Sequence, residues 1–495
     1  MSIDYSQYQR SSPAPVKKNN LYPLQQRMLL WGFILAIFAL LLQDWVVGTA
    51  IFALFAFVGA SWRSDMPPVL SACIAYQWIS ACAGYIYFID VGYFPGGANP
   101  GSAAWSLIIS LIGFGAIITG YRIGFAVFRK RITSKTMSQP ATYSVKRLLW
   151  MTIVAFGIQY FFEVAPKQIW FGGAQIVENL LTIRFIPLFV LSVAVFERKK
   201  NYTHLVIAAL WVIGPQLLTG FAKFKEILLV ILIAALVQWR PWVRSAQQTR
   251  QNRRTLMFGV IGFFATLVLG LIWSGGLKSQ WRDEIWNKDN VTTPVEKLVR
   301  FTEITSKVIN EFDLSFASEE LVGRVSSGEL YFSLVVDRVP DVVPNEDGEL
   351  FKKALLNAVQ PRFLFPEKAN LGGDSWLVKK YTGLYVAGDE SETSVGLGYM
   401  AEFYIDFGVT GVIVLCMFWG FVGSVSIAMF ARVSPSREIF FALVIVCLTG
   451  YFMSFDGSFI KLFAGYVQRM LILTAALFFF GSYIHRWMTA DSMRG

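Results

Sequence analysis

The feature that most constrains this chain is a series of apolar stretches, each close to the length that crosses a lipid bilayer as a helix. A transmembrane helix needs roughly 20 apolar residues. Charged residues make up only 16% of the chain, against about 25% in a soluble domain. We therefore predict an all-α polytopic membrane protein of about 12 transmembrane helices. The expected spans are residues 28–43, 45–62, 67–89, 103–122, 148–165, 179–197, 203–220, 226–240, 255–274, 403–430, 438–454 and 466–484.

Basic residues between the spans predict the orientation. Clusters of Lys and Arg follow the fourth, sixth, eighth and tenth spans, and they lie on one side if there are twelve spans. That side should be cytoplasmic. The tails, residues 1–27 and 485–495, are then cytoplasmic, and the first apolar stretch is not a cleaved signal peptide. Because the basic residues are explained in this way, we expect no nucleic-acid partner.

One long segment between the ninth and tenth spans, residues 275–402, should lie on the opposite, extracytoplasmic face. Residues 275–401 carry 14 basic and 20 acidic residues, a net charge of −6, whereas the remainder carries 30 basic and 13 acidic residues. Helical apolar spacing runs through Pro294–Phe312, Ser318–Val336 and Glu349–Val359. We expect a helical cap on the membrane surface, between spans one to nine (28–274) and spans ten to twelve (403–484).

Several chemistries are excluded by residue usage. The two histidines, His204 and His485, fall at cytoplasmic span ends, so no Ser-His or Cys-His pair can act on the outer face. The four cysteines lie inside spans without metal-ligand spacing, and no phosphate-binding glycine motif occurs. We therefore predict no metal and no cofactor. A base on the outer face must be a carboxylate, a lysine or the substrate itself.

Cations on the expected outer face are candidates for holding a phosphate group. Lys223 and Lys225 lie in the turn between the seventh and eighth spans, against the positive-inside rule, and either bind a phosphate headgroup or anchor the hairpin. Arg184 lies about one turn inside the sixth span and needs either a structural partner, Glu178 or Glu163, or a function. Arg282 follows the ninth span closely.

The loop supplies further candidates. Arg362 lies between two prolines in Pro361–Lys368, and an arginine can hold a diphosphate through two hydrogen bonds. The alternative is a loop arginine paired with Glu367 or Asp374. Arg324 and Lys368 complete the cations that we assign to binding.

Two carboxylates open the tenth span. Glu402 and Asp406 are four residues apart and share a helix face near the outer leaflet. One interpretation is a general base. The other is a salt bridge to Arg362 or Arg324 that fastens the loop. Asp374, after a glycine pair in the loop, is a second candidate base.

These segments together resemble a known family. Pro361-Arg-Phe-Leu-Phe-Pro-Glu-Lys368, then Ala401-Glu-Phe-Tyr-Ile-Asp-Phe-Gly-Val-Thr-Gly411, and the turn from Thr219-Gly220 to Lys225 resemble Wzy-type O-antigen and exopolysaccharide repeat-unit polymerases. The spans with one large outer loop also resemble that family, within the O-antigen ligase-like superfamily.

The resemblance implies a metal- and nucleotide-independent glycosyltransferase of the bacterial cytoplasmic (inner) membrane. It would polymerise oligosaccharides carried on undecaprenyl diphosphate, alongside a chain-length-determining or export protein. Arg362 and Lys225 would hold the diphosphate, and Glu402 would be a structural or catalytic carboxylate. The related ligases carry an outer-loop histidine that is absent here, which favours a polymerase.

Two other classes of function stay open. A flippase for the same lipid would carry charges through the depth of the membrane. A non-catalytic subunit of an export complex would use the large loop for docking. The charges of this chain gather at one surface, which favours an enzyme.

Overall fold

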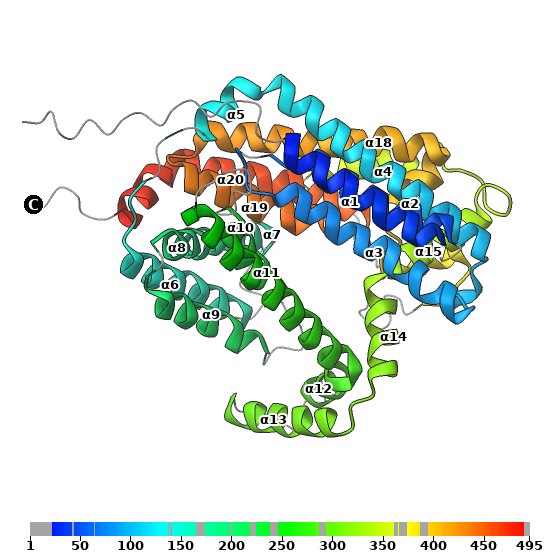
Figure 1. The fold of residues 1–495 in the computed structure, drawn as a ribbon, viewed down its shortest axis with the longest axis horizontal. Coiled ribbons are helices and arrows are strands. Elements are labelled where there is room, and N and C mark those ends of the chain that lie inside the picture. The colour runs from blue at the N-terminus through cyan, green and yellow to red at the C-terminus, as the bar shows by residue number, and fades with distance from the viewer. Residues whose placement is uncertain are drawn as a thin grey trace, which may run out of the picture.

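The computed structural model describes residues 22–41, 44–63, 65–136, 138, 141–164, 174–198, 200–217, 224–237, 246–286, 294–360, 365, 374–386 and 395–489, and within these ranges it contains helices and no strand. The helices that precede the large loop run as follows (Figure 1): α1 (Tyr22–Leu41), α2 (Trp45–Ser61), α3 (Val69–Val91), η2 (Pro95–Gly97), α4 (Pro100–Val127), α5 (Arg129–Thr136), α6 (Val145–Val164), α7 (Ala174–Leu181), η4 (Thr182–Arg184), α8 (Phe185–Arg198), α9 (Tyr202–Leu217), α10 (Phe224–Val237), α11 (Ala246–Ile272) and η5 (Trp273–Leu277).

The large loop is itself helical, as expected, and three long helices follow it. The remaining helices are α12 (Lys278–Trp286), α13 (Pro294–Asn310), α14 (Leu314–Val325), α15 (Ser327–Arg338), α16 (Glu349–Val359), α17 (Ser375–Thr382), α18 (Tyr399–Val433), α19 (Arg437–Phe452) and α20 (Phe459–Met488). Two of the predicted loop helices agree closely with α13 and α16. The stretch expected at Ser318–Val336 is instead two helices that meet at Ser326.

Among the residues that the structure describes, seven helical segments are long and apolar enough to cross a membrane, so the chain is an all-α membrane protein. They are Val69–Val91, Pro100–Val127, Val145–Phe162, Val177–Arg198, Val260–Glu284, Tyr399–Val433 and Phe459–Met488. Four shorter apolar helices accompany them: Gln25–Leu41, Trp45–Ser61, Tyr202–Gly214 and Glu226–Val237. All twelve predicted spans therefore overlap helices, but only seven of these segments have the length and hydropathy of a full span.

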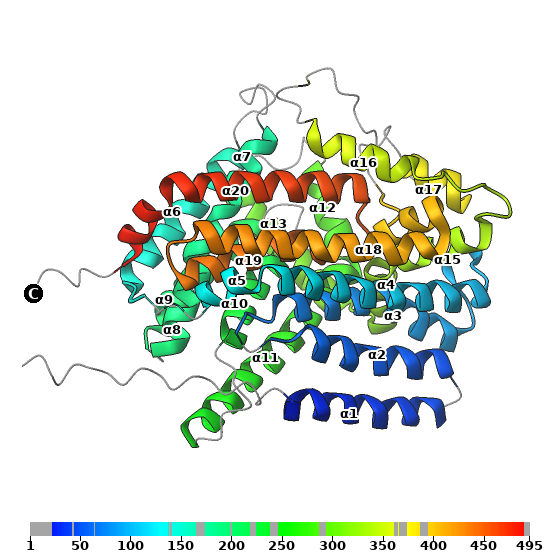
Figure 2. The ribbon, with the colours of Figure 1, turned by 90° about the horizontal axis from the view of Figure 1, so that it is seen from above.

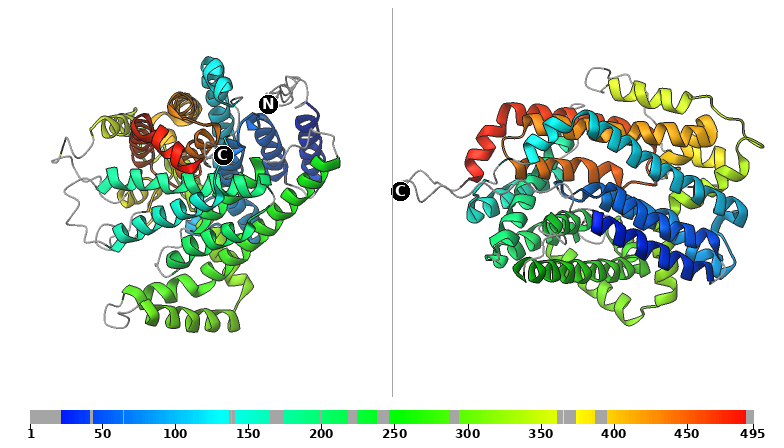
Figure 3. Two further views of the ribbon diagram at one scale, coloured as in Figure 1. Left: turned by 90° about the vertical axis from the view of Figure 1, so that its left-hand side faces the viewer. Right: turned by 45° about the horizontal axis from the view of Figure 1, so that its top comes forward.

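The hairpin of α1 and α2 lies at the edge of the bundle (Figures 2 and 3). Many large apolar side chains of α1 are exposed, with Phe38 at 61% and Leu41 at 74%. A soluble protein rarely exposes so continuous an apolar face. This apolar face of α1 is therefore suited to contact with lipid.

The tightest helix crossing joins α4 to α18 in the centre of the bundle. A Cβ atom on Gly120 would overlap the backbone carbonyl of Met417, and one on Gly420 would overlap that of Ile117. Small residues let helices approach closely in a membrane, where packing replaces the hydrophobic effect as the driving force. These two glycines therefore set the contact distance between α4 and α18.

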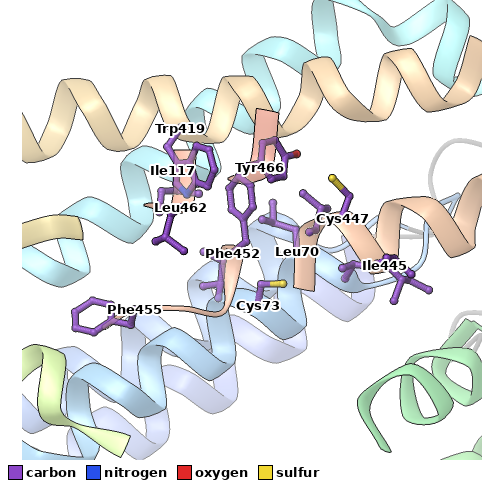
Figure 4. Packing of buried hydrophobic residues seen from close by; sticks show 14 of the residues in the cluster. Leu70, Cys73, Ile117, Trp419, Ile445, Cys447, Phe452, Phe455, Leu462 and Tyr466 are labelled. Carbon is purple, nitrogen blue, oxygen red and sulfur yellow. The ribbon is translucent and has the colours of Figure 1, made fainter. Parts of the chain in front are cut away.

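The connection between α19 and α20 is anchored in the bundle at both ends, although Asp456 in its middle is exposed. The carbonyl oxygen of Phe452, at the end of α19, accepts a hydrogen bond from Gln77 Nε2 at 2.6 Å. Gln77 is the ninth of the 23 residues of α3, about 12 Å from the start of that helix. Trp419 stacks on Phe452 with ring centroids 4.5 Å apart, and Tyr466 packs edge-on against the same indole (Figure 4). The end of α19 is therefore buried at the depth of the middle of α3.

The loop does not simply lie on the surface as a cap. The junction of α14 and α15 inserts between α3 and α4, where Gly84 leaves room for Ser326. Glu329 accepts a hydrogen bond from Ser110 Oγ at 2.8 Å, and Ser110 lies about 15 Å along α4. The expectation of a purely superficial cap is therefore corrected: a polar partner on α4 and the space left by a glycine on α3 let this tip enter the bundle.

We expect Gly120→Ala and Gly420→Ala each to destabilise the protein by about 1–3 kcal/mol, because an added methyl group forces α4 and α18 apart. The measurement is the midpoint of thermal unfolding of the purified protein in detergent. Gly157→Ala is the matched control, since nothing lies within 4 Å of a Cβ atom there. Equal loss in the control would contradict a specific role for the crossing.

Glu329 should make stability depend on pH. Burial raises the pKa of Glu329 from 4.5 to about 7. The folded state therefore holds a proton that the unfolded chain releases, and stability falls as pH rises from about 4.5 to about 7 by up to about 3 kcal/mol.

Glu329→Gln removes this proton linkage and keeps the shape of the side chain. As pH rises from 5 to 8, the unfolding midpoint of the wild type should fall relative to that of Glu329→Gln. A constant difference across that range would show that the carboxyl group does not titrate in the folded protein.

Candidate functional site

The first turn of α18 places Glu402 at the beginning of α20. Gly398, at φ +98°, precedes the helix and lies against the carbonyl of Phe455, in the connection between α19 and α20. Glu402 is 1% exposed. Its Oε2 accepts a hydrogen bond from the backbone N–H of Phe459 at 3.0 Å. Its Oε1 makes no hydrogen bond in the described part of the chain, and the hydroxyl group of Ser458 lies nearby. The carboxylate thus meets the positive end of α20, with one oxygen unused.

An ion pair lies beside this carboxylate. Asp374, which precedes α17, is 2.8 Å from Lys461 Nζ in the first turn of α20. The charge of Asp374 acts on Glu402, so the two carboxylates that were predicted as catalytic lie close together. The side chain of Asp374 is only 10% exposed, whereas that of Lys461 is 44% exposed. The site therefore combines two buried carboxylates with one accessible cation.

Lys461 is the functional candidate that sequence reasoning missed. The last span was expected to begin at residue 466, but α20 begins at Phe459. Its first turns carry a lysine that lowers the local hydropathy and hides the start of the helix. The segment Phe459-Ile460 followed by Leu462-Phe463 around Lys461 is the pattern that could have revealed it.

Asp406 has a different role from Glu402, one turn away. It accepts hydrogen bonds from the backbone N–H groups of Leu350 at 3.1 Å and Phe351 at 2.7 Å. Both belong to the first turn of α16, whose N-terminal amides have no partner in their own helix. The helix of α18 then kinks at Phe407–Gly408. Asp406 is thus a cap that fastens the loop to the span.

The alternative that Glu402 pairs with Arg324 does not hold. Arg324 pairs instead with Glu320, one turn earlier in α14, at 3.6 Å. Its charge also acts on Arg282 in α12, so these two predicted cations are brought near each other. They are on α12 and α14, whereas Glu402 lies among α16, α17, α18 and α20 (Figures 1 and 2). The structure therefore separates this basic pair from the carboxylate site.

Arg184 takes a third position. Its Nη1 donates to the carbonyl of Leu181 at 2.9 Å, and its guanidinium lies over the rings of Phe185 at 4.6 Å and Phe156 at 5.5 Å. These contacts hold the cation among α6, α7 and α8. Four other predicted binding residues are not placed: Lys223, Arg362 and Lys368 lie outside the described residues, as does the side chain of Lys225.

Within the described ranges, no group of three or more His, Cys, Asp or Glu side chains could hold a metal ion. The four cysteines, Cys73, Cys82, Cys416 and Cys447, are buried and free. Carboxylates and cations are therefore the chemical groups that the described site offers.

Comparison with known proteins gives one match. A family model described as a domain of unknown function, DUF8712, matches residues 71–480, and the chain belongs to this family. The matched region contains the carboxylate site and the whole loop, and it leaves out α1 and α2. No curated protein and no solved structure matches the chain.

We expect Asp406→Ala to loosen α16 and to lower the free energy of unfolding by about 1–3 kcal/mol, because two buried N–H groups lose their acceptor. Hydrogen exchange at Leu350 and Phe351 should accelerate locally. Asp313→Ala is the control, since Asp313 caps α14 in the same way but at an exposed position. Unchanged exchange in α16 would rule out the capping role.

Proposed function

We propose that this chain is a glycosyltransferase that polymerises oligosaccharide repeat units carried on a polyprenyl diphosphate, at the outer face of the bacterial cytoplasmic membrane. The observation that carries the proposal is the unpartnered oxygen of Glu402 beside the Asp374–Lys461 ion pair. This arrangement offers a base and a cation at one end of a membrane bundle. The resemblance of the Ala401–Gly411 segment to repeat-unit polymerases supports the same reaction.

The proposed reaction needs one proton acceptor and one stabilised leaving group. A sugar hydroxyl of the acceptor attacks the anomeric carbon of the donor glycan, and its proton passes to a carboxylate. The bond from that carbon to the diphosphate oxygen breaks, and the lipid diphosphate leaves with the bonding electron pair. Nearby cations stabilise the negative charge that grows on it.

We assign the base to Glu402 and the local cation to Lys461. Lys461 pairs with Asp374 but is 44% exposed, so a phosphate oxygen of the substrate can reach its ammonium group. Glu402 is buried in the structure, and a hydroxyl reaches it only when the residues over it move. If the diphosphate replaced Asp374 as the partner of Lys461, substrate binding would release Asp374 and would so be coupled to the movement of the residues over Glu402. Arg362, Lys368, Lys223 and Lys225 remain proposed diphosphate contacts.

The surroundings of the reaction are part of the proposal. Both termini would be cytoplasmic and the loop from α12 to α17 extracytoplasmic. The carrier would be undecaprenyl diphosphate, and a chain-length-determining or export protein would accompany the enzyme. No cofactor takes part in the proposed step.

We expect Glu402→Gln to reduce polymer formation by at least about a hundredfold, because an amide cannot accept the proton. The measurement is the length distribution of lipid-linked glycan in a strain that carries the variant as its only copy. Asp406→Asn is the matched control, since Asp406 is equally buried, lies one turn away and binds only backbone amides. It should retain most of the polymer at equal protein level.

Other outcomes distinguish the rival classes. Normal polymer in Glu402→Gln would remove Glu402 as the base. Single repeat units that stay in the inner leaflet when the chain is deleted would favour a flippase over a polymerase. Single units that reach the outer leaflet and accumulate there are the result expected of a polymerase.

A further inference from the structure

An arginine lies deep in the last long helix, where sequence reasoning assigned no function. Arg469 is the eleventh residue of α20, about 15 Å from the start of the helix. It lies within a candidate membrane-spanning segment, Phe459–Met488. Charged side chains at such positions are costly and are usually retained for a function.

The surrounding residues hold the guanidinium group in one place. Its Nε donates to Asn179 Oδ1 at 3.2 Å, and Asn179 is only 4% exposed. The guanidinium lies over the ring of Tyr451 at 4.6 Å. A Cβ atom on Gly450 would overlap its Nη1, so the absence of a side chain there makes the space. Three contacts from α7 and α19 thus fix Arg469.

The charge of Arg469 has no carboxylate in contact among the described residues. An arginine has five N–H donors, and only one is used in a hydrogen bond there. The side chain is partly exposed, and its terminal nitrogens are not among the buried atoms without a partner. The unused donors therefore reach the surface of the bundle at membrane depth.

A second arginine is fastened to the same turn of α7. Arg469 bonds to the side chain of Asn179, and Arg184 bonds to the carbonyl of Leu181, two residues further on. Both guanidinium groups also lie over aromatic rings. Both arginines are therefore fastened near the end of α7, Arg184 towards α6 and α8 and Arg469 towards α19.

We infer that Arg469 is the anion-binding residue of a membrane-embedded site for the phosphate or diphosphate group of a lipid, between α7 and α20. The site is separate from the Glu402–Lys461 site, about 12 Å further along α20 measured from Lys461 to Arg469. The guanidinium donors bind the phosphate oxygens, and the lipid tail lies along the apolar faces of the bundle. This inference does not require the proposed glycosyl transfer.

The test measures binding of farnesyl diphosphate, a short polyprenyl diphosphate, to the purified full-length protein in detergent by native mass spectrometry. Arg469→Gln should weaken binding by about tenfold to a hundredfold, since a hydrogen bond to a charged group is lost. Gly450→Ala should weaken it as well, because the new methyl group displaces a guanidinium that keeps its charge. Arg469→Lys keeps the charge and should retain part of the affinity for farnesyl diphosphate. If Arg469→Gln does not fold, the affinity of Arg469→Lys is compared with that of the wild type instead.

Arg63→Gln is the matched control. Arg63 also lies over an aromatic ring, that of Phe125 at 3.5 Å, but it pairs with Asp65 at 3.0 Å. Binding should be unchanged in this variant. Unchanged binding in Arg469→Gln, or an equal loss in Arg63→Gln, would overturn the inference.

Two further ligands identify the source of the phosphate. Inorganic diphosphate should bind at least about tenfold more weakly than farnesyl diphosphate, and equal binding would remove the lipid from the inference. If Arg469→Gln weakens the binding of phosphatidylglycerol by the same factor as that of farnesyl diphosphate, the ligand is a phospholipid headgroup. A loss confined to farnesyl diphosphate would support the polyprenyl carrier. The binding measurement involves no glycosyl transfer, and Arg469 takes no part in the proposed proton transfer, so failure of the proposed catalysis and failure of this site are separable.

Discussion

Backbone groups that are released where α19 ends and α20 begins must find partners inside the protein, because lipid offers none. The protein meets this requirement with side chains from two other spans. Gln77 on α3 donates to the last carbonyl of α19, and Glu402 on α18 accepts from the first amide of α20. Tyr399 Oη donates in turn to Gln77 Oε1 at 2.5 Å. The break is stable because one of its ends is bonded to α3, the other is bonded to α18, and these two helices are bonded to each other.

The same constraint determines where the loop lies. Because α18 bonds the N-terminal end of α20 through Glu402 and that of α16 through Asp406, the loop helix α16 is held beside α20. Asn357, near the end of α16, donates to the carbonyl of Ile460 at 3.3 Å. Asp374 then pairs with the next residue, Lys461. The carboxylates, the cation and the loop are therefore assembled around one helix terminus.

Sequence alone could predict what depends on local pattern. The apolar lengths predicted helices at all twelve expected spans, and the apolar spacing predicted α13 and α16 nearly to the residue. It could not predict the insertion of α15, because that depends on Glu329 meeting Ser110, 219 positions away in sequence. Lys461 was missed for a related reason. Its charge reduces the hydropathy of the first turns of α20, although Asp374 compensates that charge in the folded chain.

The separation of roles between Glu402 and Asp406 follows from geometry that spacing could not reveal. Both are carboxylates on one face of one helix, and both are about 1% exposed. Asp406 uses both oxygens on two amides, so protonation or removal affects only the fastening of α16. Glu402 uses one oxygen on a single amide, and its other oxygen makes no hydrogen bond in the described residues. The two carboxylates are equally buried, and they differ in the number of backbone amides that they bind. Asp406 binds two and is a cap, whereas Glu402 binds one and is the candidate base.

Charge distribution bears on how an anionic lipid would reach this site. Residues 275–401 carry a net charge of −6, so the aqueous side of the loop repels a diphosphate at long range. Arg184 and Arg469, by contrast, lie within candidate membrane-spanning segments. The anionic headgroup of a lipid in the bilayer would therefore be attracted by the two arginines and repelled by the acidic loop. For a lipid-linked substrate this favours lateral approach between the spans, with the Glu402–Lys461 site reached along α20 rather than through the loop.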